Sequence, residues 1–161
     1  MPRPVAFLLK SAVLALLCFL GPACLSAAEF RTERLEIHRQ DGKVLHFIVE
    51  LATDDAERQQ GLMNREEMKP DDGMLFDFGI SRRVHMWMKN TYLPLDMLFI
   101  SEKGRVEHIR ADTMPLSEDI IDSQADVRYV LEINGGLSET LGITMGDTVS
   151  SMQIARTAGQ Q

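Results

Sequence analysis

The sequence predicts a mainly β protein: a single-domain β-sandwich or small barrel with one short helix. Three observations predict this class. Short stretches alternate apolar and polar residues as strands do, tight-turn dipeptides separate several of them, and no repeat, low-complexity run or Pro/Gly/Ser linker divides the chain. We therefore expect one β-rich domain over residues 29–161, which is long enough to enclose a hydrophobic core.

Residues 1–28 have the order of an export signal. A basic start without acidic residues is followed by the apolar run AVLALLCFL and then by the small residues LSAA, which predicts cleavage after Ala28. The apolar run is shorter than the ~20 residues that cross a bilayer, so we expect no transmembrane segment after cleavage and a periplasmic or secreted protein. An uncleaved anchor helix is the alternative interpretation.

Cysteine and charge exclude several classes of function. Both cysteines, Cys18 and Cys24, lie in the predicted signal, so the mature chain is expected to have no disulfide, thiol nucleophile or thiolate metal site. The chain carries 24 acidic and 17 basic residues, a formal net charge of −7, and has no basic stripe. Such a surface repels nucleic-acid phosphates, so we predict no nucleic-acid partner.

The first two predicted strands, residues 34–38 and 44–51, flank Asp41-Gly42, a dipeptide typical of hairpin turns. The odd-numbered positions of the second strand are all apolar, whereas His46 and Glu50 lie on its other face. Because side chains alternate along a strand, one face is expected in the core and the other in solvent.

Residues 53–62 are predicted to form the one short helix. Thr53 or Asp54 provides its N-cap, acidic residues of the first turn suit the positive end of its dipole, and Gly61 ends it.

The rest of the chain is predicted as strands over residues 73–78, 83–89, 95–101, 105–111, 128–133 and 148–155. Lys103-Gly104 is expected to join the third and fourth of these in a hairpin, and residues 135–143 to contain one helical turn. The acidic segment 117–126 is interpreted as a solvated loop, because it lacks the oxygen spacing and glycine of a calcium-binding loop.

Trp87, the only tryptophan of the chain, lies in the stretch VHMWMKNTYLPLDMLFI, residues 84–100. In a strand, Val84, Met86 and Met88 share the natural core face and Trp87 lies on the opposite one. Alternation alone favours a strand covered on both faces, with Trp87 packed and its N–H bonded. The other interpretation makes Trp87 a stacking surface for a ligand.

A short turn follows Trp87 and gathers four polar residues, Lys89, Asn90, Thr91 and Asp96, around Pro94. The structural interpretation has Asn90 and Asp96 bonding the backbone of the turn, which these residue types do well. The functional interpretation has them contacting a ligand directly.

Two charged residues stand in apolar surroundings: Arg65, after GLMN, and Glu132, inside RYVLEI. A charge in an apolar strand must find a partner or reach water, so an Arg65–Glu132 pair and a Lys89–Asp96 pair are both considered. A hydrolase using Asp96 or Glu132 as general base is an alternative function, and it needs that carboxylate in a cleft with a raised pKa.

Methionines suggest a further alternative, because thioethers suit Cu(I) and all ten methionines but Met1 follow the predicted signal. The ligands of such a site would be Met63, Met86 and Met88. In a strand, however, His85 points away from Met86 and Met88, and methionine also fills irregular cores. We therefore predict no cofactor and no metal, and copper is the weaker alternative.

The strings GLMNR, GMLFDF, WMKNTYLPLDMLFI and VLEINGG…GITMGDTV resemble, in order and spacing, the family named domain of unknown function 192, over about residues 33–150. The resemblance implies a compact β-rich domain, often behind an export signal, and no assigned activity. The family usually has an aromatic or apolar residue where His85 or Met86 stands, which weakens copper further. The polar residues at matching positions are Arg65, Lys89, Asn90, Thr91, Asp96 and Glu132.

We therefore expect an exported binding or accessory module that holds a small ligand or an envelope protein, with no residue assigned a catalytic role. The candidate binding residues are Arg65, Trp87, Lys89, Asn90, Thr91, Asp96 and Glu132.

Overall fold

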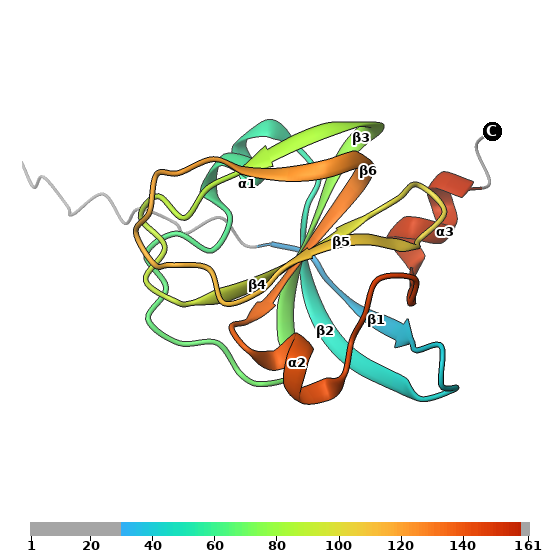
Figure 1. Ribbon diagram of the computed structural model, residues 1–161. Helices are drawn as coiled ribbons and strands as arrows, with labels where there is room; N and C mark the ends of the chain where they lie inside the picture. The colour runs from blue at the N-terminus through green and yellow to red at the C-terminus, as the bar shows by residue number, and fades with distance from the viewer. Residues whose placement is uncertain (1–29, 159–161) are drawn as a thin grey trace, which may run out of the picture.

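The computed structural model describes residues 30–158 (Figure 1). The predicted export signal, its cleavage after Ala28 and both cysteines lie outside these residues. Within residues 30–158, every helix is too short or too polar to span a membrane.

The described chain forms one seven-stranded sheet with three short helices, which confirms the mainly β prediction. The elements are β1 (Thr32–His38), β2 (Val44–Ala52), α1 (Asp55–Gln60), β3 (Asp72–Met86), β4 (Leu95–Ile100), β5 (Val106–Arg110), β6 (Ile121–Asn134), α2 (Leu137–Leu141), β7 (Thr148–Ser151) and α3 (Met152–Ala158). The strand order is β5-β4-β6-β3-β2-β1-β7. All neighbours are antiparallel except β2 and β3, which are parallel.

The sheet curls until its two edge strands meet, which makes it a small barrel. Arg105, just before β5, forms an isolated antiparallel bridge with Thr148 of β7. The amide of Val149 donates to the carbonyl of Gly104 over 2.7 Å in the same place. A side chain at Gly104 would put its Cβ 2.4 Å from the Val149 carbonyl oxygen, and the residue has a φ of +82°, so only glycine fits this junction.

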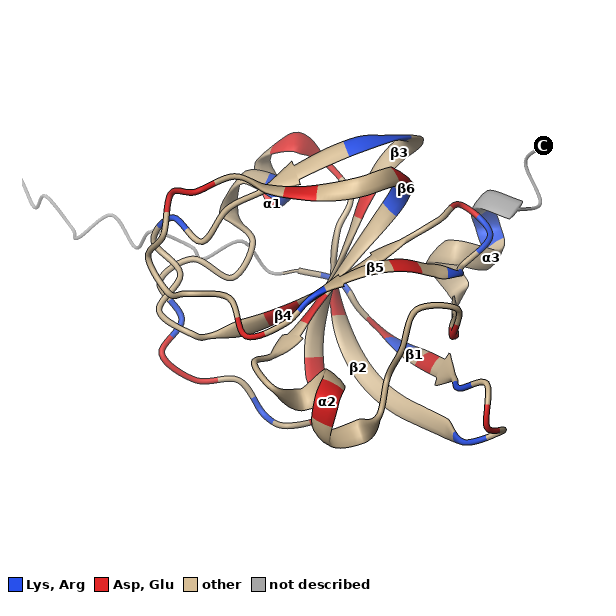
Figure 2. Cartoon of the chain, in the orientation of Figure 1, with Lys and Arg blue, Asp and Glu red and all other residues tan. Residues whose placement is uncertain are grey.

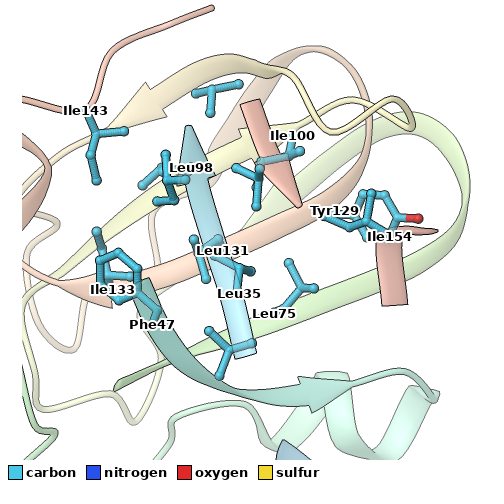
Figure 3. Close-up of a cluster of buried hydrophobic side chains, with 14 of the residues drawn as sticks. Leu35, Phe47, Leu75, Leu98, Ile100, Tyr129, Leu131, Ile133, Ile143 and Ile154 are labelled. Carbon is cyan, nitrogen blue, oxygen red and sulfur yellow. The ribbon is translucent and has the colours of Figure 1, made fainter. Parts of the chain in front are cut away.

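One hydrophobic core fills the inside of the curled sheet (Figure 3). Phe47 of β2, Leu75 of β3 and Leu131 of β6 point toward one another there, and all are buried. Ile143, after α2, and Ile154 of α3 pack into the same cluster. The alternation predicted for residues 44–51 is confirmed, because Phe47, Val49 and Leu51 all point into this core from one face of β2.

A second core lies on the outer face of the sheet. It contains Met74 and Phe76 of β3, Met97 of β4 and Val130 of β6, covered by Leu62 after α1. All six residues of β4 are buried, because this strand has one core on each face. The outer core positions the candidate site described below.

The helix predicted after residue 52 is confirmed as α1. The Asp54 carboxylate accepts from the backbone N–H of Glu57 over 2.8 Å, and the Glu57 carboxylate accepts from the Asp54 N–H in return, so the two form a capping box. Gly61 is the C-cap, as predicted.

Three local predictions were wrong. Residues 73–78 and 83–89 are not separate strands: they form the single strand β3, interrupted by an irregularity between Asp77 and Arg82, and β3 ends at Met86. The segment 121–126 is not a loop but the first part of β6, which pairs with the far half of β3.

The third wrong prediction concerns the end of the described chain, where α3 was not expected; α2 confirms the helical turn expected within residues 135–143. Residues 152–155 were predicted to continue a strand, but they belong to α3. The ladder of β7 with β1 ends at the pair Leu35–Ser151. Beyond it the chain leaves the sheet, and Ile154 packs into the inner core from a helix.

Acidic and basic residues are interspersed along the described chain instead of separating into one basic face (Figure 2).

Candidate functional site around Glu132

Glu132 faces the outer core from the middle of the sheet. Its neighbours along β6, Leu131 and Ile133, belong to the inner core, so alternation turns Glu132 to the opposite face. Across the ladders it lies opposite Met74 of β3 and Met97 of β4, which are both fully buried. The side chain of Glu132 is itself only 4% exposed.

This carboxyl group is unpartnered. Within residues 30–158 the side chain of Glu132 forms no hydrogen bond and no ion pair. Burial alone raises the pKa of Glu132 from 4.5 to about 8, because no charge or hydrogen bond stabilises the ionised form. At pH 7 roughly nine molecules in ten therefore carry a protonated, uncharged Glu132.

Glu132 lines a pocket of about 120 Å3, whose other lining residues include parts of α1 and the end of β3. Its other walls are largely apolar. They include Leu62 and Met63 after α1, Phe76 of β3, and Met86 and Trp87 at the end of that strand.

Arg58 and His85 also line the pocket, and both are engaged elsewhere. Arg58 donates to the backbone carbonyls of Thr53 and Asp77, over 2.8 and 2.6 Å, and pairs with Asp55 over 2.6 Å. His85 lies 3.0 Å from the carboxylate of Asp122. Neither residue is paired with Glu132.

Trp87 is not packed on both faces. It is 48% exposed at the rim of the pocket, and the Lys89 ammonium lies 5.3 Å from the centre of its ring. The interpretation favoured by alternation was therefore wrong: β3 ends at Met86, one residue before Trp87. The core face was predicted correctly: Val84 and Met88 are buried.

Asn90 and Thr91 form the turn beside the pocket. Asn90 has a left-handed φ of 55°, and its carbonyl accepts from the Asn64 amide over 2.8 Å, which ties this turn to the segment after α1. The Thr91 hydroxyl donates to the carbonyl of Lys89 over 3.3 Å, and Thr91 lines the pocket.

Asp96 lies on the opposite face of the sheet from Glu132, and both of its carboxylate oxygens accept hydrogen bonds. It is fully buried and accepts from the backbone amides of Asp112, Gly136 and Ser138, over 2.7, 2.9 and 2.7 Å. These bonds hold the loop after β5 and the start of α2, so Asp96 has a structural role, but the prediction that it bonds the backbone of its own turn was wrong. The Lys89–Asp96 pair is not formed; Lys89 lies 4.0 Å from Glu118 instead.

Arg65 also lies outside the pocket. Its guanidinium forms a two-bond pair with Glu50 of β2 and lies 5.7 Å from the ring centre of Phe30. This pair borders a separate groove of about 640 Å3 on the outer face of β2. The Arg65–Glu132 pair is therefore not formed.

The structure thus brings Trp87, Thr91 and Glu132 together in one pocket, with Lys89 and Asn90 beside it. It places Arg65 and Asp96 elsewhere. Phe76 and Leu62 were missed as site residues, since an apolar residue in a strand or after a helix carries no sequence signal that separates a pocket wall from a core.

The methionines named for copper do not share one environment. Met63 and Met86 line the pocket, but Met88 is buried and its sulfur accepts from the Thr113 hydroxyl over 3.2 Å. Across residues 30–158, no group of three or more His, Cys, Asp or Glu side chains is arranged to hold a metal ion.

Comparison with known proteins gives a family and two related structures. The model of the family DUF192, described as an uncharacterized ACR, matches residues 36–151. A solved structure from Sinorhizobium meliloti 1021, described as a "putative transcription regulator", is 49% identical, with a TM-score of 0.76 over 78% of this chain and 97% of its own. A protein of unknown function from Novosphingobium aromaticivorans DSM 12444 is 35% identical, with a TM-score of 0.74 over 81% and 92% of the two chains. No curated protein sequence matches.

Proposed function

The chain belongs to the DUF192 family, and we propose that it is a binding module that takes a small ligand into the pocket between α1, the end of β3 and Glu132. The observation that carries this proposal is the buried, unpartnered carboxyl group of Glu132 at an otherwise apolar pocket. Leaving a polar group buried without a hydrogen bond costs about 1–3 kcal/mol. A ligand that completes its bonds removes that cost.

The composition of the pocket supports binding of a small molecule. Ligand sites are concave and mostly apolar, with a few polar groups that fix orientation. Here Phe76, Met63 and Met86 provide apolar wall, Glu132 provides the polar group, and the half-exposed ring of Trp87 provides a stacking surface at the rim.

Binding is favoured over hydrolysis. Asp96, one of the two carboxylates considered as general base, has both oxygens committed to backbone amides. Glu132 has the raised pKa and the pocket that a general base needs, but Arg58, His85 and Thr91 in the pocket walls bond to other groups rather than to it.

The proposal includes export. The order of residues 1–28 supports a signal that directs the mature domain to the periplasm or the outside of the cell. A role in transcription regulation, named in the description of one relative, gains no support as direct DNA binding from this chain, because its net charge of −7 repels phosphate.

Methyl-detected NMR of methionine tests the binding proposal. Met63 and Met86 line the pocket, whereas Met145 and Met152 are 60% and 61% exposed, lie outside it, and serve as internal controls. Fragments of four to six heavy atoms are expected to shift the methyl signals of Met63 and Met86 without moving those of Met145 and Met152. Equal shifts at all four methyl groups, or none at Met63 and Met86 across neutral, cationic and anionic fragments, would contradict it.

A further inference from the structure

Resting on the proposed function, we infer that the pocket recognises a protonated alkylamine, whose ammonium group pairs with the ionised carboxylate of Glu132 while its short alkyl chain lies against Met63, Met86 and Phe76. Such a group can come from a free amine or from a lysine side chain of a partner.

The base of the pocket selects for a hydrogen-bond donor that carries a positive charge. Glu132 has no partner among residues 30–158, and an ammonium group brings three donors and the charge opposite to that of the ionised carboxylate, which repels anions. A charge-assisted bond of this kind is about twice as strong as a neutral one.

No other charge competes for Glu132. The neighbouring strands present Met74 of β3 and Met97 of β4 to it. Among residues 30–158, the other titratable side chains lining the pocket are Arg58, bound to Asp55 and two carbonyls, and His85, paired with Asp122. A cation entering the pocket therefore meets one unoccupied carboxyl group.

The walls suit a short alkyl chain behind a cation. Thioethers and phenyl rings contact methylene groups, and aromatic faces attract ammonium groups by cation–π interaction. Two aromatic rings of the pocket already lie near cations. The Lys89 ammonium is 5.3 Å from the centre of the Trp87 ring, and the guanidinium groups of Arg58 and Arg82 are 5.8 and 5.2 Å from the centre of the Phe78 ring. The net charge of −7 also draws cations toward the protein.

The volume of the pocket limits the length of the alkyl chain that it can hold. The pocket volume of about 120 Å3 equals that of roughly four water molecules in the liquid. A chain of about four carbons with its nitrogen near Glu132 therefore fills it, which matches n-butylammonium or the end of a lysine side chain.

Binding of an amine is coupled to release of a proton. The pKa of Glu132 in the free protein is about 8, so below this pH the carboxyl group must lose its proton before it pairs with the ammonium. The dissociation constant should therefore fall about ninefold from pH 6 to pH 7 and about fivefold from pH 7 to pH 8. It should then level off, because alkylamines and lysine stay protonated to about pH 10.

The fluorescence of Trp87, the sole tryptophan, reads the site directly. We would titrate the purified protein and Glu132→Gln with n-butylammonium, 1-butanol and butanoate at pH 6, 7, 8 and 9. At pH 8 we expect n-butylammonium to bind at least tenfold more tightly than 1-butanol. In Glu132→Gln the affinity for n-butylammonium should fall at least tenfold and should no longer depend on pH. Unchanged 1-butanol binding in the variant shows that its pocket is intact.

Two results would overturn the inference: 1-butanol or butanoate binding as tightly as n-butylammonium, or amine binding that survives Glu132→Gln. If neutral fragments shift the methyl groups of Met63 and Met86 while n-butylammonium does not, the proposed function stands and the amine is wrong. If no fragment shifts them, both fail. Comparison of n-butylammonium with Nα-acetyl-lysine methylamide then separates the two sources of the ammonium group. Tighter binding of the lysine derivative indicates a lysine side chain of a partner, and tighter binding of n-butylammonium indicates a free amine.

Discussion

Glu132 lies directly opposite Met97 in the ladder of β4 and β6, and both side chains are buried on the outer face of the sheet. A carboxyl group beside a thioether, with no hydrogen bond or ion pair among residues 30–158, is an unusual element of a core. Its burial lowers the free energy of unfolding unless a ligand binds it. Several consequences for stability and binding can be measured.

Glu132 should make the protein less stable as the pH rises. Its pKa is raised from 4.5 to about 8 on folding, so between these values the folded state binds a proton that the unfolded state lacks. The free energy of unfolding then falls with increasing pH, by about 1 kcal/mol per unit from pH 5 to pH 8, and levels off above. Urea denaturation at pH 5, 6, 7 and 8 measures this slope.

Glu132→Gln should remove that part of the slope and be the more stable protein at pH 8. Glu118→Gln, at a side chain that is 68% exposed, serves as the control and should keep the slope of the parent. Parallel curves for the parent and Glu132→Gln would show that Glu132 does not titrate in this range.

Asp96 should be a structural residue. In Asp96→Asn, one of the oxygens that accept from the amides of Asp112, Gly136 and Ser138 becomes a donor group. At least one buried amide then loses its partner, and we expect a loss of about 2–4 kcal/mol in the free energy of unfolding, with fragment binding by the folded protein unchanged. A folded Asp96→Asn protein with weakened binding would place Asp96 in the ligand site after all.

Trp87 and Tyr92 form a matched pair for testing the rim of the pocket. They are 48% and 49% exposed and five residues apart, but only Trp87 lines the pocket. Trp87→Ala should weaken n-butylammonium binding several-fold, because a stacking and cation–π surface is lost, whereas Tyr92→Ala should not. Titrations followed at the methyl groups of Met63 and Met86 give both affinities, and equal losses would remove Trp87 from the site.

Arg65 should contribute to stability and not to the Glu132 pocket. Its pair with Glu50 is partly exposed, at 30% and 26% of the two side chains, so solvent screening limits its value to about 1 kcal/mol or less. Arg65→Met is expected to lose no more than that in urea denaturation and to bind n-butylammonium as the parent does. A tenfold loss of affinity would show that the two regions are coupled.

Several parts of the fold could be predicted because their causes are local. The capping box of Asp54 and Glu57 needs residues three positions apart, and the single-faced pattern of β2 needs only alternation. Glu132 could be recognised as exceptional for the same reason, since a charged residue inside RYVLEI breaks the pattern of its own strand.

Other parts depended on which strands became neighbours. Arg65 was considered as the partner of Glu132, but the segment between α1 and β3 brings it to Glu50 of β2. The acidic segment 121–126 is a strand because the far half of β3 pairs with it, which its polar composition does not indicate. Residues 152–155 form a helix because the β1–β7 ladder ends at Ser151.

By itself the sequence determined the β-rich class, the short capped helix, the core faces of β2 and of the strand before Trp87, and the presence of one carboxyl group in an apolar strand. Periodicity and capping act over a few residues, so they can be read along the chain. Only the tertiary structure decided that this carboxyl group has no partner and that it shares a pocket with Trp87 and Met63. Those relationships join α1, β3 and β6, and they arise from the strand order and from the outer core that packs between them.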